Sequence, residues 1–395
     1  MALSAGVGRA SSRGSASTQA AELWKGATAN LSAPPRALIL FSPFSGKEHL
    51  GVVAELSRLS GGCPLIGGTT YGAILGSSLE EEAHVLLALS GDIRAGLGLG
   101  TGLAHDAFAA GRSAAQRAAA ALEGPGKLLI LFHEPQMGDC ARLVDGVRSV
   151  LGENFPVVGG GTGTGLIMEQ SPVSKQFLGT RVLAGGCAAM LLGGEFRLSF
   201  GFSHGAVAVG KPFTLTKAKG NILVELDGRP ALEVLEETLG VACSSGLPFS
   251  AFSVSCGKLE EGFEEFPLMG FWGADRARKT VLCGTPIQEG RRYVFVRTRS
   301  DSILEDTRRA AREAARALKP STARLALVFD CYGRKIQLGS QGLIQAELKA
   351  LAEAAGSAPL VGMYSGSEIG VLKGPGGRGV SRYTHASTAF VVLGD

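Results

Sequence analysis

The sequence has few of the features that are typical of proteins that bind nucleic acids or span membranes. Tyrosine and tryptophan are scarce, at five and two residues, so few side chains are available to stack on bases. The 39 basic residues are nearly balanced by 35 acidic ones, an excess too small to indicate a nucleic-acid partner. No apolar run approaches the roughly 20 residues of a membrane-spanning helix. We therefore expect neither nucleic acid nor a membrane among the partners.

The cysteines form no CxxC pair and no metal-type spacing. An odd, dispersed set in a chain of 395 residues is typical of a reducing compartment rather than of a disulfide framework. We therefore predict a cytoplasmic protein without a metal site. The seven are Cys63, Cys140, Cys187, Cys243, Cys256, Cys283 and Cys331.

The first 20 residues are rich in serine, alanine and glycine and contain two arginines but no acid. This composition predicts a disordered tail over residues 1–34. An organelle transit peptide is the alternative, although the stretch has no clear amphipathic pattern.

Glycine is abundant, with 58 residues, about twice ordinary usage. Many of these glycines belong to a pattern that occurs three times. A buried-type strand ends in Phe ("ALILF", "LLILF", "LALVF"), an amphipathic helix follows, and a short run Pro-x-x-Gly leads into a Gly-rich turn. The interval from Phe to Pro is the length of a strand–helix–strand crossover. The three intervals are 41–64, 132–156 and 329–359.

The fold class predicted from this pattern is α/β, with duplicated strand–helix–strand units forming sheets with Gly-rich loops. Region 211–300 does not follow the pattern and separates the second unit from the third. We therefore expect a two-lobed chain with one domain over 35–212 and another over 213–395.

Polar residues in the loops are the candidate ligand-binding residues, because loops at the carboxyl ends of strands border a shared crevice in open α/β sheets. The third unit is the richest in chemical groups. Glu368 is predicted either to receive an ammonium group or to cap its own turn, and Arg334 either to clamp a carboxylate or to pair with Glu368. The full candidate set is Thr69, Thr70, Tyr71, Cys331, Arg334, Gly362, Tyr364, Glu368 and His385.

Catalysis is a weaker interpretation of the same residues. Cys331, His385 and Glu368 can be written as a nucleophile triad, but a cysteine in an apolar strand is commonly inert, and His385 fits a hydrogen-bonded core position. We name no catalytic residue. The Arg-rich segment with Arg308, Arg309, Arg312 and Arg316 alternates with acids and is predicted to be a solvated, salt-bridged helix face.

Three motifs in the C-terminal half resemble those of the FIST family, whose N- and C-terminal domains occur in bacterial signalling proteins and F-box proteins. They are Phe329-Asp-Cys331-Tyr-Gly333-Arg334, Pro359-Leu-Val-Gly362 with Ser367-Glu368-Ile-Gly370, and His385-Ala-Ser-Thr388. The N-terminal turn Gly67–Ala73 corresponds to a further family motif. Four positions depart from the family pattern: Gly68, Ala73, Ser367 and Ala386. No F-box-like segment or output domain is recognised, so a stand-alone module is expected.

The resemblance implies a sensor that binds a small, amino-acid-like molecule and acts on a separate signalling protein. Glu368 and Arg334 would then take the two charged ends of a zwitterion. A haem-binding nitric-oxide sensor is the alternative, with an axial ligand from one of six histidines, His133 among them, or from a cysteine. A scaffolding module of the F-box type and a Cys-nucleophile enzyme remain further alternatives.

Overall fold

The three predicted strand–helix–strand units are all present in the computed structural model, which describes residues 2–45, 48–163, 174–240, 242 and 254–395. In each unit the two strands pair in parallel, and the strand-ending Phe lies opposite the residue that follows the glycine of Pro-x-x-Gly. The units are β2 (Ala37–Pro43), α2 (His49–Leu59) and β3 (Leu65–Thr70); β8 (Gly126–His133), α4 (Cys140–Leu151) and β9 (Val157–Gly161); and β21 (Ala323–Cys331), α7 (Tyr332–Leu338), α8 (Gln341–Ala355) and β22 (Leu360–Ser365).

The glycine of each Pro-x-x-Gly run is required by a close approach of backbone. A Cβ atom at Gly67, Gly159 or Gly362 would lie 2.0, 2.0 and 1.9 Å from a carbonyl oxygen of the neighbouring parallel strand. Only glycine fits such a contact. The repeated glycine in the sequence is therefore a packing requirement of the paired strands, and it lies in the same place in all three units.

After each Gly-rich turn the chain leaves its own sheet and joins another unit's sheet. β4 (Ala73–Leu75) of the first unit pairs with β22 of the third, and β10 (Lys175–Leu178) of the second pairs with β3 of the first. β23 (Glu368–Lys373) of the third unit pairs with β9 of the second. This cyclic exchange ties the units into one body with approximate three-fold symmetry.

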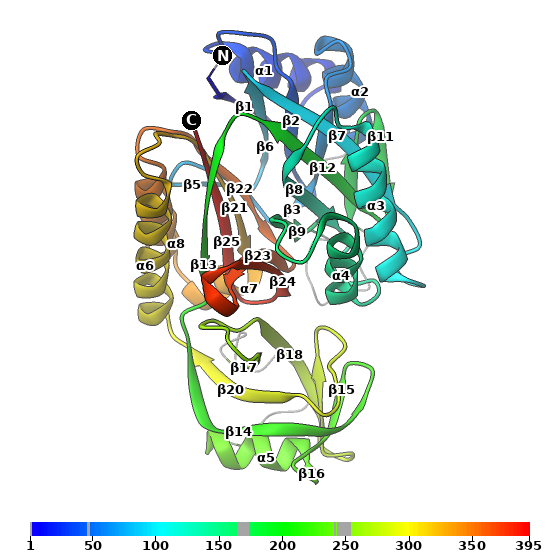
Figure 1. Ribbon diagram of the computed structural model, residues 1–395, viewed down its shortest axis with the longest axis vertical. Helices are drawn as coiled ribbons and strands as arrows, with labels where there is room; N and C mark the ends of the chain where they lie inside the picture. Colours follow the sequence, from blue (N-terminus) through cyan, green and yellow to red (C-terminus); the bar gives the residue numbers. More distant parts are fainter. Residues whose placement is uncertain (1, 46–47, 164–173, 241, 243–253) are drawn as a thin grey trace.

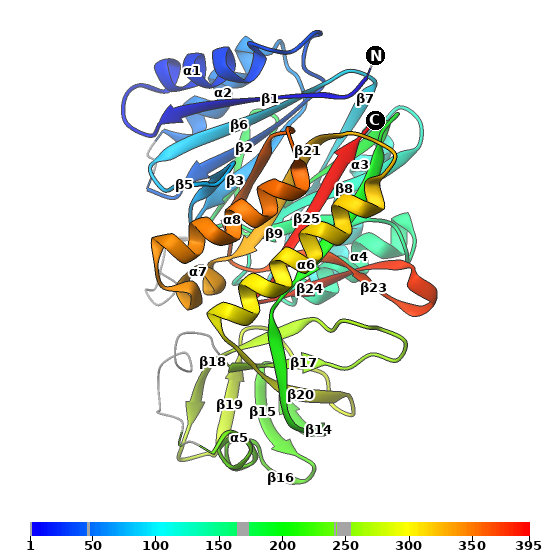
Figure 2. The ribbon, with the colours of Figure 1, turned by 90° about the vertical axis from the view of Figure 1, so that its left-hand side faces the viewer.

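The body contains three six-stranded sheets, with helices on their outer faces (Figures 1 and 2). Their strand orders are β1-β6-β2-β3-β10-β11, β24-β23-β9-β8-β12-β7 and β13-β25-β21-β22-β4-β5. The remaining elements of the body are β1 (Ser4–Ser11), α1 (Ala16–Thr28), β5 (Ser78–Glu80), β6 (Ala83–Ser90), β7 (Ile93–Gly100), α3 (Ala107–Ala121), β11 (Arg181–Ala184), β12 (Cys187–Gly194), β13 (Arg197–Ser203), α6 (Ser300–Leu318), the 3-10 turn η2 (Pro375–Gly377), β24 (Gly379–Thr384) and β25 (Thr388–Gly394).

The three strand-ending phenylalanines meet inside the body. The Phe41 and Phe132 ring centroids lie 5.9 Å apart, and those of Phe132 and Phe329 lie 5.8 Å apart. All three side chains are fully buried in the core cluster that the three sheets share. The same residue in each copy of the pattern therefore builds a common core.

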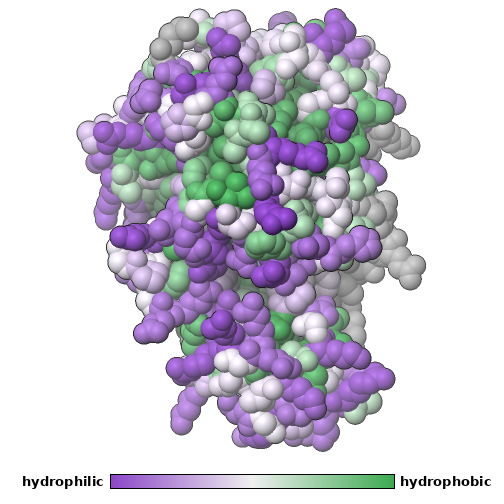
Figure 3. Space-filling model, turned by 45° about the vertical axis from the view of Figure 1, so that its right-hand side comes forward, coloured by the Kyte–Doolittle hydropathy of each residue, from purple (hydrophilic) through white to green (hydrophobic). Residues whose placement is uncertain are grey.

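Region 206–298 forms the smaller lobe below the body in Figure 1. β14 pairs with both β20 and β15, which closes the sheet into a barrel around an apolar core. Its elements are β14 (Ala206–Lys219), β15 (Ile222–Leu226), β16 (Arg229–Pro230), α5 (Ala231–Leu239), β17 (Val254–Lys258), β18 (Leu268–Asp275), β19 (Thr280–Cys283) and β20 (Arg292–Thr298). On the face in Figure 3, hydrophobic residues gather mainly over the body, and hydrophilic ones cover much of the small lobe.

The two-lobed α/β architecture is as predicted, but the lobes are not the two halves of the chain. The predicted boundary at 212/213 lies inside β14, where Gly210 and Pro212 fall in a break of the β14–β20 ladder. After the small lobe the chain returns to the body through α6, and the third unit completes the body.

The prediction of a disordered tail over residues 1–34 is wrong. β1 pairs with β6 along its whole length, and α1 begins at the N-cap Ser15 and buries Leu23. A Cβ atom at Gly8 would lie 1.9 Å from the Leu23 carbonyl oxygen. The small residues that suggested flexibility instead let α1 pack directly on the backbone of β1.

Within the described residues, no helix is both long and apolar enough to cross a membrane. Six cysteines in that part of the chain are free thiols, and five of these are buried. Cys243 lies outside the described residues.

Candidate functional site

The three Gly-rich turns come together at one end of the body and hydrogen-bond to one another. The Gly163 amide donates to the Thr69 carbonyl at 2.6 Å, and the Tyr71 amide donates to the Tyr364 carbonyl at 3.1 Å. The Gly161 amide donates to Ser367 at 2.8 Å. The sequence predicted loops around a crevice of one open sheet, whereas these turns belong to three sheets and bond directly to one another.

The predicted residues of the first turn serve mainly to join these turns. The Thr69 hydroxyl donates to the Gly163 carbonyl at 2.7 Å, and the Thr70 hydroxyl donates to the Tyr364 carbonyl at 2.9 Å. Tyr71 stacks on Tyr332 with ring centroids 4.4 Å apart. Tyr364 is buried and Gly362 lies within β22. The structure thus gives these five candidates contacts that hold the turns in place.

Glu368, at the start of β23, is fully buried. Its carboxyl group accepts hydrogen bonds from the Ser365 hydroxyl at 2.9 Å and from the Ser387 hydroxyl and amide at 3.1 and 3.3 Å. Removal from water raises the pKa of Glu368 to about 8, because burial disfavours the charged form. At neutral pH the group is therefore mostly a neutral acid bound within its own turn region.

Cys331 contacts Glu368, but the pair is not an activated nucleophile. Burial and the nearby Glu368 carboxyl raise the pKa of the Cys331 thiol well above its usual value, whereas a nucleophilic cysteine requires a lowered one. The third member of the written triad is engaged elsewhere. His385 Nδ1 accepts from the Gly270 amide at 3.1 Å, and Nε2 contacts the Tyr383 hydroxyl at 2.9 Å. The triad is not assembled.

His385 belongs instead to a chain of buried polar groups at the junction of the two lobes. The Tyr383 side chain also forms a hydrogen bond with the Ser367 side chain. The Ser367 hydroxyl in turn lies 3.2 Å from His133 Nε2. Burial lowers the pKa of His385 to about 4 and that of His133 to about 3, so both rings are neutral at pH 7. Because both His385 nitrogens have partners, this ring is not available to a haem iron. The Nδ1 atom of His133 has no partner among the described residues.

Backbone groups of the small lobe form hydrogen bonds with this end of the body. The His385 amide donates to the Leu268 carbonyl at 2.9 Å, and the Leu268 amide donates to the Thr384 hydroxyl at 3.0 Å. The turn between β24 and β25 is thus bonded directly to β18. A change in how the lobes meet would act on the same turn that holds Ser387 against Glu368.

Arg334 does not pair with Glu368. It is fully buried between the third sheet and the outer helices, in a hydrogen-bonded ion pair with Glu347 and 3.2 Å from Asp330. It also donates to the Thr307 hydroxyl at 2.8 Å and to the Ser203 carbonyl at 3.4 Å. With these partners the guanidinium is not available to clamp a ligand carboxylate.

A cleft of about 370 Å³ lies between the lobes, beside the buried chain of polar groups. Its walls come from α4, from the small-lobe segment after β17, and from β24. Figure 1 shows α4 and β24 on the part of the body that is next to the small lobe. It carries charges of both signs and shares Tyr383 with the buried chain. The lining residues include Asp145, Arg148, Lys258, Glu260, Glu261, Met269, Gln288, Arg291, Arg382 and Tyr383.

One ion pair crosses this cleft from lobe to lobe. Arg382 on β24 holds Glu260 of the small lobe, with Nη2 and Nε 2.6 and 3.1 Å from Oε2. The Arg382 guanidinium also lies over the Phe263 ring, 4.8 Å from its centroid. Each side chain of the pair keeps 17% of its surface exposed. This pair was not among the predicted site residues, because Glu260 lies in the non-repeating region and Arg382 outside the recognised motifs.

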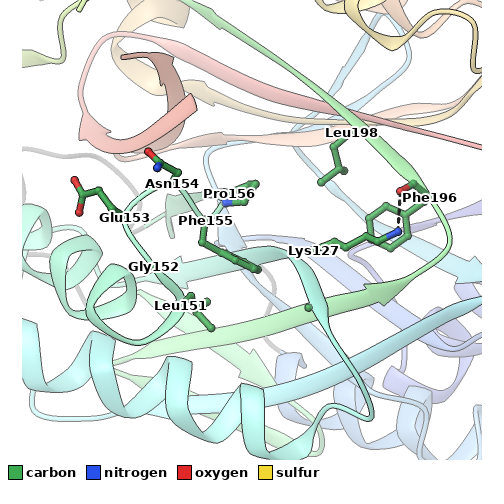
Figure 4. A pocket seen from close by; sticks show the side chains of 10 residues that line it. Lys127, Leu151, Gly152, Glu153, Asn154, Phe155, Pro156, Phe196 and Leu198 are labelled. Carbon is green, nitrogen blue, oxygen red and sulfur yellow. Dashed lines mark hydrogen bonds between the residues drawn. The ribbon is translucent and has the colours of Figure 1, made fainter. Parts of the chain in front are cut away.

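A second pocket, of about 600 Å³, lies on the body, and none of the predicted site residues lines it. Figure 4 shows its lining side chains. Phe155, Phe196 and Leu198 line it together with Lys127. The Lys127 ammonium donates to the Phe196 carbonyl at 3.4 Å and lies 5.4 Å from the Phe196 ring centroid. Its cation therefore already has partners in the pocket wall.

Comparison with known proteins identifies the family. Residues 36–229 match the FIST N domain and residues 231–371 match the FIST C domain. The chain belongs to the FIST family, whose domains are associated with small-ligand binding in sensory signal transduction.

The curated relatives and solved structures that match add no specific activity. An uncharacterized protein of Mycobacterium tuberculosis is 28% identical over 208 residues, 51% of this chain and 53% of the relative. One of Mycobacterium bovis is 27% identical over 178 residues, 44% of this chain and 45% of the relative. The chain thus spans about half the length of these relatives. A cyanuric acid hydrolase from A. caulinodans is similar with 11% identity and a TM-score of 0.40, covering 98% of this chain and 99% of that structure. Similarity at this level carries no information on function.

Proposed function

We propose that the protein is a sensory module that binds a small zwitterionic, amino-acid-like molecule between its body and its small lobe. The bound state is passed to a separate signalling protein, and the module acts in the cytoplasm. Family membership supports the sensory role. The charged inter-lobe cleft supports the class of ligand.

The observation that carries the proposal is the Arg382–Glu260 pair across the cleft. An amino acid has a carboxylate that matches the guanidinium fork and an ammonium group that matches the Glu260 carboxylate. It can therefore replace each partner of the pair with an equivalent one. Arg291 also lines the cleft and has no ion pair among the described residues, so it supplies a further cation for the ligand carboxylate.

This exchange links binding to the arrangement of the lobes. In the structure, Arg382 on the body holds Glu260 on the small lobe directly. A ligand inserted between them keeps both charges paired and increases their separation. A ligand shifts a conformational equilibrium only through a difference in affinity between two states, and here the difference is the broken inter-lobe ion pair. The position of Arg382 two residues before Thr384 couples this change to the turn bonded to β18.

A thermal-shift screen with amino acids, nucleotides and haem tests the proposal. A compound at 100 times its dissociation constant stabilises the folded protein by about 2.7 kcal/mol, so we expect an amino acid to raise the melting temperature. The Arg382→Gln variant should lose that response. Arg229→Gln, which removes an exposed small-lobe ion pair with Glu237, should keep it. No response to amino acids, or an equal response in Arg382→Gln, would contradict the proposed site.

A further inference from the structure

We propose that a groove between α6 and the start of β14 is the docking surface for an extended acidic segment of the partner protein. The groove has a volume of about 890 Å³. Figure 2 shows α6 on the outside of the body, and β14 running from the lower end of the body into the small lobe. The inference rests on the proposed function in that it locates the partner of the sensory module.

Most arginines of α6 do not form the salt bridges that the sequence predicts for this helix face. Only Arg309 follows that prediction, with ion pairs to Asp306, Glu265 and Glu313. The side chains of the other three arginines have no ion pair or hydrogen bond with any described residue, and all three are exposed. They are Arg308, Arg312 and Arg316.

These three arginines form a row of unpaired cations along α6. They lie four residues apart, so their Cα atoms follow one another at about 6 Å along the helix. Alternate residues of an extended chain lie about 6.6 Å apart on one side. Carboxylates at alternate positions of an extended segment therefore match the row.

The other end of the groove is apolar. Val207 is 61% exposed, and it is one of two large hydrophobic side chains that are strongly exposed in the described part of the chain. Phe266 and His204 stack beside it with ring centroids 5.0 Å apart. The exposed Val207 side chain supplies an apolar contact at this end of the groove, beside the unpaired arginines. The fitting partner segment thus carries acids at alternate positions and an apolar side chain at one end.

Two features favour an acidic protein segment over a nucleic acid. Five acids also line the groove: Glu265, Asp306 and Glu313 are paired with Arg309, whereas Glu264 and Glu305 have no ion pair among the described residues and repel a continuous phosphate backbone. The row has three arginines at one helix face, whereas nucleic-acid surfaces spread positive charge over a whole face of a domain. A short segment can contact the arginines and avoid the acids.

The test uses fluorescence anisotropy with a labelled 12-residue peptide in which Glu alternates with Ser and two Leu residues occupy one end. We expect saturable binding to the full chain that weakens between 50 and 200 mM salt. A peptide with Lys in place of Glu should not bind. Charge reversal in R308E/R312E/R316E should weaken binding by about tenfold or more, and Val207→Ser should weaken it about threefold.

The matched control is R112E/R117E/R181E, which reverses three exposed arginines elsewhere on the body. Binding within twofold of the wild type in this control supports the groove. Absence of peptide binding, or equal losses in the two triple variants, overturns it. Melting curves verify that both variants fold. An amino-acid response in the thermal-shift screen without peptide binding refutes the docking surface alone and leaves the ligand site intact.

Discussion

The protonation of Glu368 gives the sharpest quantitative prediction. Its carboxyl is fully buried, and burial raises its pKa from 4.5 to about 8. A folded-state pKa above the unfolded value means that the stabilising contribution is complete below pH 4.5 and is lost as pH rises through 8. At about 1.4 kcal/mol for each pKa unit, the loss is about 5 kcal/mol between those limits.

The Glu368→Gln variant removes the titration and keeps the shape of the side chain. A Gln amide can accept from Ser387 through its oxygen and donate to the Ser365 hydroxyl through its nitrogen, which preserves the contacts of Glu368. We therefore expect wild type and variant to have similar stability near pH 5. By pH 9 the variant should be the more stable protein, by up to about 5 kcal/mol.

The assay is denaturant unfolding of both proteins from pH 5 to pH 9, and the measured quantity is the difference in free energy of unfolding. The buried histidines act in the opposite sense: His133 and His385 have lowered pKa values, so their contribution is lost as pH falls below about 6.5. Both proteins contain these histidines, so the difference isolates Glu368. A difference that stays constant with pH, or that favours the wild type at pH 9, would show that Glu368 is not a buried neutral acid.

Two further substitutions test the buried ion cluster and the strand pairing. Glu347→Gln removes the negative charge that pairs with Arg334 at a site where both side chains are fully buried, so it should cost about 3–5 kcal/mol in urea unfolding; a loss below 1 kcal/mol would contradict a buried ion pair. Gly362→Ala places a Cβ atom 1.9 Å from the Val328 carbonyl oxygen and should lower the melting temperature by several degrees. Gly342→Ala, where nothing lies within 4 Å, should be neutral or stabilising, and equal effects of the two alanines would refute the packing argument.

The repeated units were predictable because their signals are local. A run of apolar residues, an amphipathic helix and Pro-x-x-Gly each fall within about 30 residues of chain, the length of one crossover. The cyclic exchange of β4, β10 and β23 was not predictable, because these strands are short and pair with units far away in sequence. The alternation of apolar and polar residues along a strand predicts which of its faces is buried, but it does not indicate which sheet the strand joins.

The candidate site was predicted only in part for a related reason. Glu368 and Cys331 do lie together, as motif positions of one unit. Arg334 is held by Glu347, an acid on the buried face of α8 among Ile344, Leu348 and Leu351. An acid within an apolar stripe was a detectable signal for a buried ion pair. Arg382 and Glu260 lie about 120 residues apart, and no local pattern joins them.

A distance measurement shows whether a ligand separates the lobes by replacing the Arg382–Glu260 pair. Spin labels at Gly342→Cys on α8 and Lys219→Cys on β14 report on the body and the small lobe, in a protein with Cys63 and Cys243 replaced by serine. The stabilising amino acid from the thermal-shift screen is added at about 100 times its dissociation constant. We predict that the distribution of distances between the labels shifts on binding, and that Arg382→Gln shows no ligand-dependent shift. A ligand that binds while the distribution stays unchanged would show that binding does not separate the lobes.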